Sequence, residues 1–379
     1  MRTGIRRRHL LAVWVLVAFA ACGDGIGPEA APLATSSAEA QLLDSALLED
    51  LAVAATRGDY GEVHSLLVVR NEHIVLERYF RGYHRDRFHP LYSVTKSVAS
   101  SLIGLAWDQG RVELDARLLD LFPQYPDVRN RDSRKEAITL EQVLTMTAGF
   151  RWDEWSVPYL DPLNPVRRLA QSSDWLRHVL DLPMAGDPGA AFEYNSGCST
   201  LLSGVVEHAT GRHAESYAAD RLFEPLGITH WIWQTGPNEL TATGWGLELT
   251  PRDMARFGLL FLEGGTFRGR RILSEEWVNR STELHVGAVS GLGYGYQWWR
   301  LPSGYVGDGG ERNGGVFFAW GWGDQFIFVL PAYEMVVVTT AGNYDVEGDP
   351  PMDFLRSHIL PAIRDAERSS GAGAIAAAW

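Results

Sequence analysis

Lysine is so rare in this chain that its two positions draw attention to chemistry. The 379 residues include 34 basic ones, of which only Lys96 and Lys135 are lysines. Lys96 closes a Ser-Val-Thr-Lys tetrapeptide that begins at Ser93. A guanidinium group keeps its proton in a protein, whereas a buried lysine can lose it. A serine hydroxyl becomes a useful nucleophile when such a base lies within hydrogen-bond reach.

The spacing of Ser93 and Lys96 places both on one face of a helix that starts near Ser93, since positions i and i+3 are neighbours. The positive end of the helix dipole disfavours a charged lysine, and burial acts in the same direction. Free N–H groups at the helix start can also receive an oxyanion. A Ser/Lys nucleophile pair is therefore predicted. The alternative is a helix cap followed by a lysine that faces solvent.

Two further segments carry groups that suit the same chemistry. Tyr194, in the segment 192–197, can shuttle protons to a leaving group if it lies beside a Ser/Lys pair. The segment 319–325 reads Ala-Trp-Gly-Trp-Gly-Asp-Gln and leads into a β-rich run, and its glycines permit close backbone approach to a ligand. A backbone N–H there could pair with that of Ser93 as an oxyanion hole. The structural alternatives are a half-buried tyrosine and a glycine-rich turn with stacked tryptophans.

The elements that must position these groups follow from periodicity and turn signals. Apolar spacing predicts a helix over 38–55 and another from Ser93 to Gly110, and β-rich runs predict a hairpin of 63–70 with 73–80. The region 111–250 is loop-rich with short helices. The C-terminal part predicts strands over 315–319, 325–330 and 335–340, then a helix over 353–366. We predict an α+β fold, an α/β sandwich: an antiparallel sheet from both chain ends, flanked by helices, with an inserted helical lobe.

The N-terminus predicts export. Four arginines precede an apolar run of about a dozen residues that ends at Ala21, and this run is too short to span a bilayer comfortably. The small residues before Cys22 resemble a bacterial lipoprotein box, so residues 1–21 are predicted to be a lipoprotein signal peptide. Cys22 would then carry lipid and anchor the chain at the periplasmic side of a membrane. The common inner-membrane retention signal has aspartate directly after the lipidated cysteine. Here the aspartate is Asp24, two positions after Cys22, so the resemblance slightly favours the outer membrane. An ordinary secretory signal is the alternative.

The remaining boundaries and exclusions come from composition. We predict a flexible tether over 22–38, a catalytic domain over 39–366 with its helical insertion at about 111–250, and a disordered tail over 367–379. The net charge of −13 disfavours nucleic acid as a partner. The chain has no Gly-x-Ser-x-Gly elbow, no His-Glu-x-x-His and no phosphate loop, so neither a metal nor another cofactor is predicted.

The three segments, in this order and spacing, resemble the serine β-lactamase and penicillin-binding-protein superfamily. The resemblance points to the branch of class C β-lactamases, family VIII esterases, D-aminopeptidases and 6-aminohexanoate-dimer hydrolases. It extends over roughly residues 40–365. Further matching stretches lie at 140–150, 194–199, 249–256 and 294–299.

The resemblance implies a role for each matching residue. Ser93 would be the acylated nucleophile, Lys96 its base, and Tyr194 the second acid/base. Ser196 stands where the Tyr-x-Asn motif has asparagine. Ala319-Trp320-Gly321 aligns with the Lys-Thr-Gly triplet, which makes the N–H of Trp322 the second oxyanion donor beside that of Ser93.

Departures from the family pattern bear on the substrate. Ala319 cannot hold a substrate carboxylate as the triplet's lysine does, and together with Ser196 it favours a small-molecule ester or amide as substrate. We expect the substrate to contact a set of five residues: Ser196, Trp152, Trp155, Trp320 and Gly321. A β-lactamase or D,D-peptidase remains an alternative, as does a non-catalytic binding or sensor protein. The natural substrate and the oligomeric state are left open.

Overall fold

The computed structural model describes residues 31–302, 305, 315–344 and 350–364. The predicted signal peptide, the lipidation of Cys22, the first part of the tether and the tail over 367–379 lie outside these residues. Within the described part of the chain, no helix has the length and apolar character to cross a membrane.

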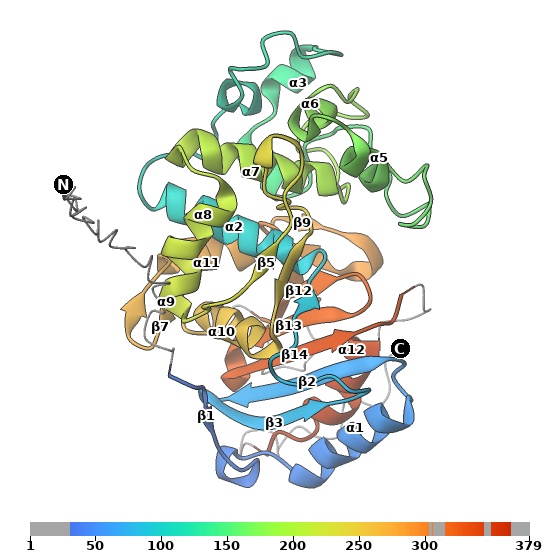
Figure 1. Ribbon diagram of the computed structural model, residues 1–379, viewed down its shortest axis with the longest axis vertical. Coiled ribbons are helices and arrows are strands. Elements are labelled where there is room, and N and C mark those ends of the chain that lie inside the picture. The colour runs from blue at the N-terminus through green and yellow to red at the C-terminus, as the bar shows by residue number, and fades with distance from the viewer. Residues whose placement is uncertain (1–30, 303–304, 306–314, 345–349, 365–379) are drawn as a thin grey trace, which may run out of the picture.

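A nine-stranded sheet forms the lower half of the molecule (Figure 1). Its order is β1-β3-β2-β14-β13-β12-β11-β10-β9, and every pair is antiparallel except β1 with β3. The strands are β1 Ala34–Thr35, β2 Val63–Arg70, β3 His73–Tyr79, β9 Val286–Gly287, β10 Gly293–Tyr294, β11 Trp299–Arg300, β12 Phe317–Gly321, β13 Gln325–Leu330 and β14 Met335–Ala341. Because β14 pairs with β2, both chain ends build one sheet, and the predicted fold class is confirmed.

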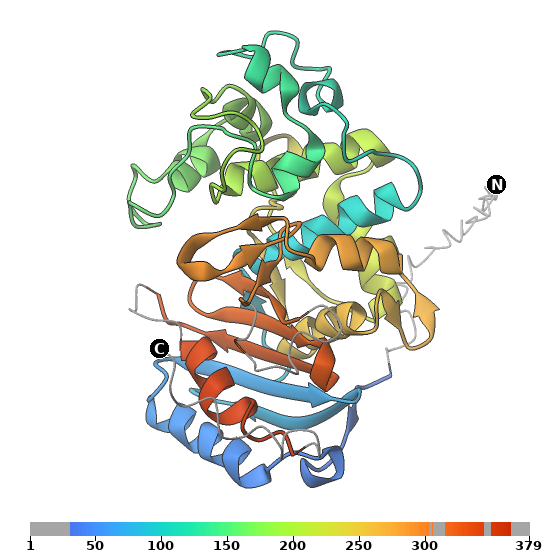
Figure 2. The same cartoon turned by 180° about the vertical axis from the view of Figure 1, so that it is seen from behind.

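The central strands are buried on both faces because helices cover the sheet from either side (Figures 1 and 2). One side carries α1 (Ser45–Arg57) with α12 (Pro350–Phe354). The other carries α10 (Pro251–Leu262), which packs on β14, β13 and β2. Thr250 caps α10 through the amide of Asp253, and proline occupies its first turn, as the sequence predicts.

The long helix α2 (Val94–Trp107) joins the sheet to the helical lobe. It contacts β12 and β13 on one side and α7 of the lobe on the other. The lobe contains one further long helix, α7 (Ser196–Thr210). The short helices of the lobe and its lower rim are α3 Ser133–Ala137, α4 Leu140–Leu144, α5 Pro165–Gln171, α6 Trp175–Leu180, α8 Ala214–Ala218 and α9 Glu224–Leu226. Helix α11 (Glu275–Thr282) follows α10. A small sheet of β4 (His89–Pro90), β6 (Leu247–Leu249) and β5 (Ile232–Trp233) lies beside α2, and β7 (Thr266–Phe267) pairs with β8 (Arg270–Arg271).

Three predicted boundaries differ from the structure. Residues 34–35 pair with β3, and Leu33 and Ala38 are buried, so the folded body begins inside the segment predicted to be a tether. The first helix starts later than predicted because Asp44 caps it and Leu42 adopts a left-handed conformation. At the C-terminal end, the helical region runs over 350–359 and stops before the predicted residue 366.

Candidate active site

Ser93 and Lys96 meet at the start of α2. The helix begins directly after Ser93, and the Lys96 Nζ donates hydrogen bonds to the Ser93 Oγ and to the carbonyl oxygen of Gly244, both at 2.7 Å. Lys96 is buried, with 1% of its surface exposed. Burial lowers the pKa of Lys96 to about 8, against the opposing charge of Glu154, which raises it. A lysine with this pKa exists partly as the neutral amine near pH 8, and the neutral amine can accept the serine proton.

Tyr194 lies next to this pair, because the chain turns into α7 just after it. Asn195 caps α7 by accepting from the amide of Cys198, which fixes the backbone at Tyr194. The Lys96 Nζ lies 5.0 Å from the centre of the Tyr194 ring. Burial raises the pKa of the Tyr194 phenol and the charge of Glu154 adds to this, while the Ser93 hydroxyl opposes it. The phenol is therefore held in its protonated form, ready to donate.

Ser93 and Tyr194 line a cavity of about 310 Å³, and Lys96 lies buried behind Ser93. The cavity lies between the ends of β12 and β13 and the lobe loop 154–159. Six aromatic side chains line it: Trp155, Tyr159, Tyr194, Trp299, Trp320 and Trp322. No lysine or arginine is among the described residues that line it.

The structure separates the five residues predicted to contact substrate into two groups. Trp155, Trp320 and Gly321 line the cavity. Trp155 is 44% exposed and stacks on Tyr194, with 4.9 Å between the ring centres. Trp152 and Ser196 are buried and do not line the cavity. Their polar groups are used internally, since both donate to Glu154.

The end of β12 lies against the turn that precedes the nucleophile. A Cβ on Gly321 would stand 2.1 Å from the carbonyl oxygen of Leu91, so only glycine permits this approach. Trp322 is the next residue in the chain, so its backbone also lies near this turn. Among the described residues, neither the amide of Ser93 nor that of Trp322 has a hydrogen-bond acceptor. Both amides are available to an oxyanion; their role as its donors stays a prediction.

Sequence reasoning missed Glu154, a buried carboxylate that lines the same cavity. It accepts hydrogen bonds from Trp152, Tyr159 and Ser196, and the contact with Ser196 spans 42 positions of sequence. No periodicity or motif marks a loop residue whose partner lies so far along the chain.

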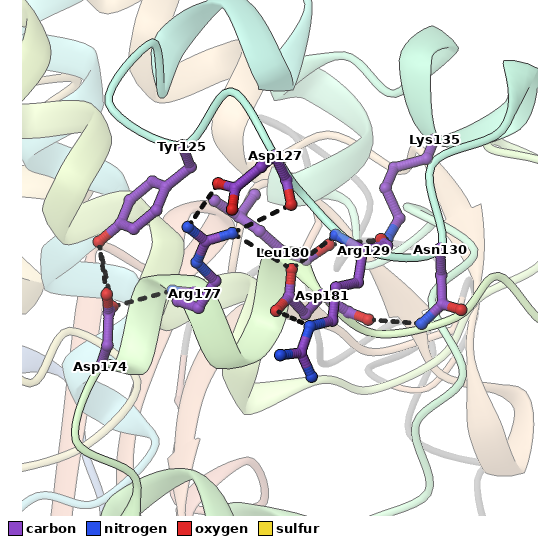
Figure 3. Close-up of polar contacts among 9 residues, drawn as sticks. All are labelled: Tyr125, Asp127, Arg129, Asn130, Lys135, Asp174, Arg177, Leu180 and Asp181. Carbon is purple, nitrogen blue, oxygen red and sulfur yellow. Dashed lines mark hydrogen bonds and ion pairs between the residues drawn. The ribbon is translucent and has the colours of Figure 1, made fainter.

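Lys135 lies in the helical lobe, apart from the cavity. Figure 3 shows its amino group between the backbone of Arg129 and that of Leu180. Nζ donates to these two carbonyl oxygens at 2.6 and 2.7 Å. Around it, Arg177 pairs with Asp127, and Asp181 accepts from the amide of Arg129. The described residues contain no group of three or more His, Cys, Asp or Glu side chains suited to a metal ion.

Comparison with known proteins identifies the family. The family model described as Beta-lactamase matches residues 55–356. The chain is 29% identical over 259 residues to a 6-aminohexanoate-dimer hydrolase of Paenarthrobacter ureafaciens, over 62% of this chain and 63% of that protein. It is 25% identical over 202 residues to a lovastatin esterase of Penicillium rubens, over 48% of each chain. The chain thus spans less than two thirds of these relatives.

Solved structures share the fold. A family VIII carboxylesterase superposes with a TM-score of 0.66 at 16% identity, over 85% of this chain and 98% of the other. The family match covers most of the chain, and the Ser-x-x-Lys pair and the tyrosine meet beneath one cavity. The chain belongs to the β-lactamase family.

Proposed function

We propose that this protein is a serine hydrolase that cleaves a carboxylic ester or amide through an acyl-enzyme on Ser93. The observation that carries the proposal is the 2.7 Å contact between the Lys96 Nζ and the Ser93 Oγ under an open cavity. Burial lowers the pKa of Lys96 to about 8, which supports a lysine that works as a base near neutral pH.

The reaction proceeds in two halves. The Ser93 Oγ attacks the carbonyl carbon while its proton passes to the neutral Lys96. The amides of Ser93 and Trp322 hold the oxyanion. The Tyr194 phenol gives its proton to the leaving oxygen or nitrogen and regains one from the lysine ammonium. Water then attacks the acyl-enzyme, its proton returns through Tyr194 and Lys96, and Ser93 is released with its hydroxyl restored.

The cavity favours an uncharged, apolar or aromatic substrate. Six aromatic side chains line it, and the described wall offers no lysine or arginine to a substrate carboxylate. Glu154 and Asp324 contribute carboxyl groups to the wall, which disfavours anions further. An ester or amide without a carboxylate therefore suits this site better than a β-lactam or a peptidoglycan peptide, both of which carry one.

We also propose that the protein acts outside the cytoplasm, anchored to a membrane by lipid on Cys22. The basic start, the apolar run and Cys22 support export as a lipoprotein, with the domain held at the periplasmic side of a membrane. Mass spectrometry of Cys22 in membrane fractions tests this. Lipid on Cys22 is the expected result, and an unmodified, soluble chain would contradict it.

The experiment that tests the activity compares three substrates with one preparation: a short-chain p-nitrophenyl ester, a p-nitroanilide and a chromogenic cephalosporin. Ser93→Ala serves as the control. We expect turnover of the ester or the anilide that is lost in the variant, with little cephalosporin turnover. Efficient cephalosporin hydrolysis would instead establish a β-lactamase. Activity on none, with no acylation of Ser93 by a fluorophosphonate probe, would contradict a catalytic role.

A further inference from the structure

Glu154 is a buried carboxylate whose hydrogen-bond donors are all neutral. Only 1% of the residue is exposed. Its Oε2 accepts from the Trp152 indole at 2.6 Å and from the Ser196 amide at 2.7 Å. Its Oε1 accepts from the Ser196 hydroxyl at 2.8 Å and from the Tyr159 hydroxyl at 2.9 Å. Within the described chain no arginine, lysine or histidine forms an ion pair with it.

The four donors account for the hydrogen bonds but not for the charge. Burying a carboxylate without a cation is costly, even where donors satisfy its oxygens. Glutamine in its place could keep its carbonyl oxygen toward the Trp152 indole and the Ser196 amide, but its NH₂ group would require the two hydroxyls to turn and accept. Either a cation nearby stabilises the negative charge of Glu154, or burying that charge lowers the stability of the protein.

The cation that shares neighbours with Glu154 is Lys96, since Lys96 lies against Tyr194 and the residues beside Tyr194 and Glu154 contact one another. Lys96 lies against the ring of Tyr194, and Tyr194 stands two residues before Ser196, which binds Glu154. Glu154 lines the cavity whose floor holds Ser93. The negative charge of Glu154 raises the pKa of Lys96 and so opposes burial, which lowers that pKa.

We propose that Glu154 is a positioning residue that acts through Lys96, holding a fixed negative charge that stabilises the lysine ammonium formed when Ser93 gives up its proton. This role rests on the serine hydrolase function proposed above. The lysine must be neutral to accept the proton and stable once it has accepted it. Burial supplies the first condition and Glu154 the second. Glu154 touches none of the reacting atoms.

A purely structural role is the competing explanation. Glu154 ties the loop 152–159 to the start of α7, and Trp155 of that loop stacks on Tyr194. Loss of these hydrogen bonds would disturb the site without any electrostatic effect. The two roles separate in the titration of Lys96, because geometry alone does not change the charge that the lysine faces.

The chain offers an unusual internal control for this titration, since it contains only two lysines. Protein labelled with ¹³C at the lysine Cε carbon gives two side-chain signals, which Lys135→Met assigns. In Glu154→Gln we expect the titration midpoint of Lys96 to fall by about one pH unit. Lys135, buried in the lobe, should keep its midpoint in the same spectra.

Three further variants sharpen the result. Glu154→Asp keeps the charge, and Ser196→Ala removes one hydrogen bond and keeps the charge, so both should leave the midpoint of Lys96 near that of the wild type. If Glu154→Gln does not fold, a combined Glu154→Met, Tyr159→Phe, Ser196→Ala variant removes the two hydroxyl donors together with the acceptor. Only the Trp152 indole and the Ser196 amide then lose their partner. The combined variant should show the same fall.

A midpoint of Lys96 that stays unchanged in folded Glu154→Gln, or that moves equally in Ser196→Ala, overturns the inference. The pH profile of kcat/KM gives the second readout, and its acid limb should shift to lower pH in Glu154→Gln alone. Because the NMR titration requires no turnover, it fails or succeeds independently of the proposed function. Loss of that function would appear as activity that survives Ser93→Ala.

Discussion

The two lysines of this chain are alike in almost every local property, yet their surroundings suit different roles. Each is buried, and each donates to two oxygens at 2.6 or 2.7 Å. Burial lowers the pKa of each to about 8, and nearby carboxylates oppose it in both cases: Glu154 for Lys96, Asp181 and Asp132 for Lys135. A low lysine pKa by itself therefore does not mark a catalytic base.

What differs is the chemistry of the acceptors and the access to them. Lys96 faces a hydroxyl group that carries a proton to give, beneath a cavity of about 310 Å³. Lys135 faces two backbone carbonyl oxygens, which have no proton, within the packed lobe (Figure 3). One site can exchange a proton with a substrate-bound group, and the other can only hold two chain segments together.

The largest effect expected from this comparison concerns activity. Lys96→Arg should reduce kcat/KM on a p-nitrophenyl ester by about 10³-fold, because a guanidinium group does not give up its proton. Lys135→Arg is the matched variant and should keep activity in the fraction that folds. Equal losses in the two variants, after correction for folded protein, would contradict the assignment of distinct roles.

Gly321→Ala tests whether the surroundings of Lys96, and not the lysine alone, make the site active. The new methyl group would meet the Leu91 carbonyl oxygen at 2.1 Å, so the end of β12 must move away from the nucleophile turn. We expect kcat/KM to fall by about 10²-fold. Gly287→Ala, in β9 of the same sheet, meets no atom within 4 Å and should leave the rate unchanged. Full activity of Gly321→Ala would show that this approach is unimportant.

The sequence predicted Lys96 and its partners better than it predicted their surroundings. Ser93 and Lys96 are three positions apart on a helix, and such local spacing determines whether two side chains can meet. The hairpin β2–β3 was predicted for the same reason, as its turn at 71–72 and its β-rich runs are contiguous. The two-residue strand β1 was not predicted, because its pairing depends on β3, almost forty positions away.

Loop residues show most clearly which contacts could not be predicted from the sequence. Trp152 and Trp155 are three positions apart in a segment without periodicity, so the sequence could not tell that one is buried and the other lies over Tyr194. Ser196 was predicted to face substrate by its place in a motif. The structure turns its hydroxyl to Glu154, a partner that only tertiary packing supplies.

The stability of the lobe gives a smaller test. Lys135→Met removes the donor from two carbonyl oxygens, those of Arg129 and Leu180. Leaving buried acceptors without a donor costs about 1–3 kcal/mol, and we expect the free energy of unfolding to fall by that order. Urea denaturation followed by tryptophan fluorescence measures it, with kcat/KM unchanged below the transition. A variant as stable as the wild type would mean that Lys135 holds nothing together.

The change in stability expected per pH unit for each lysine is smaller, and it concerns both lysines equally. Both pKa values are lowered from 10.5 to about 8, so between these values the unfolded chain binds more protons than the folded one. Stability should therefore rise with pH across this window, by up to about 1.4 kcal/mol per pH unit for each lysine. Buried tyrosines with raised pKa values oppose the rise above about pH 10, so the slope is best measured from pH 8 to 9.5. Lys135→Met should remove about half of the lysine contribution and Lys96→Met the other half. An unequal division, with Lys135 contributing nothing, would show that its amino group keeps its proton, and that the two sites differ in charge state as well as in the acceptors they face.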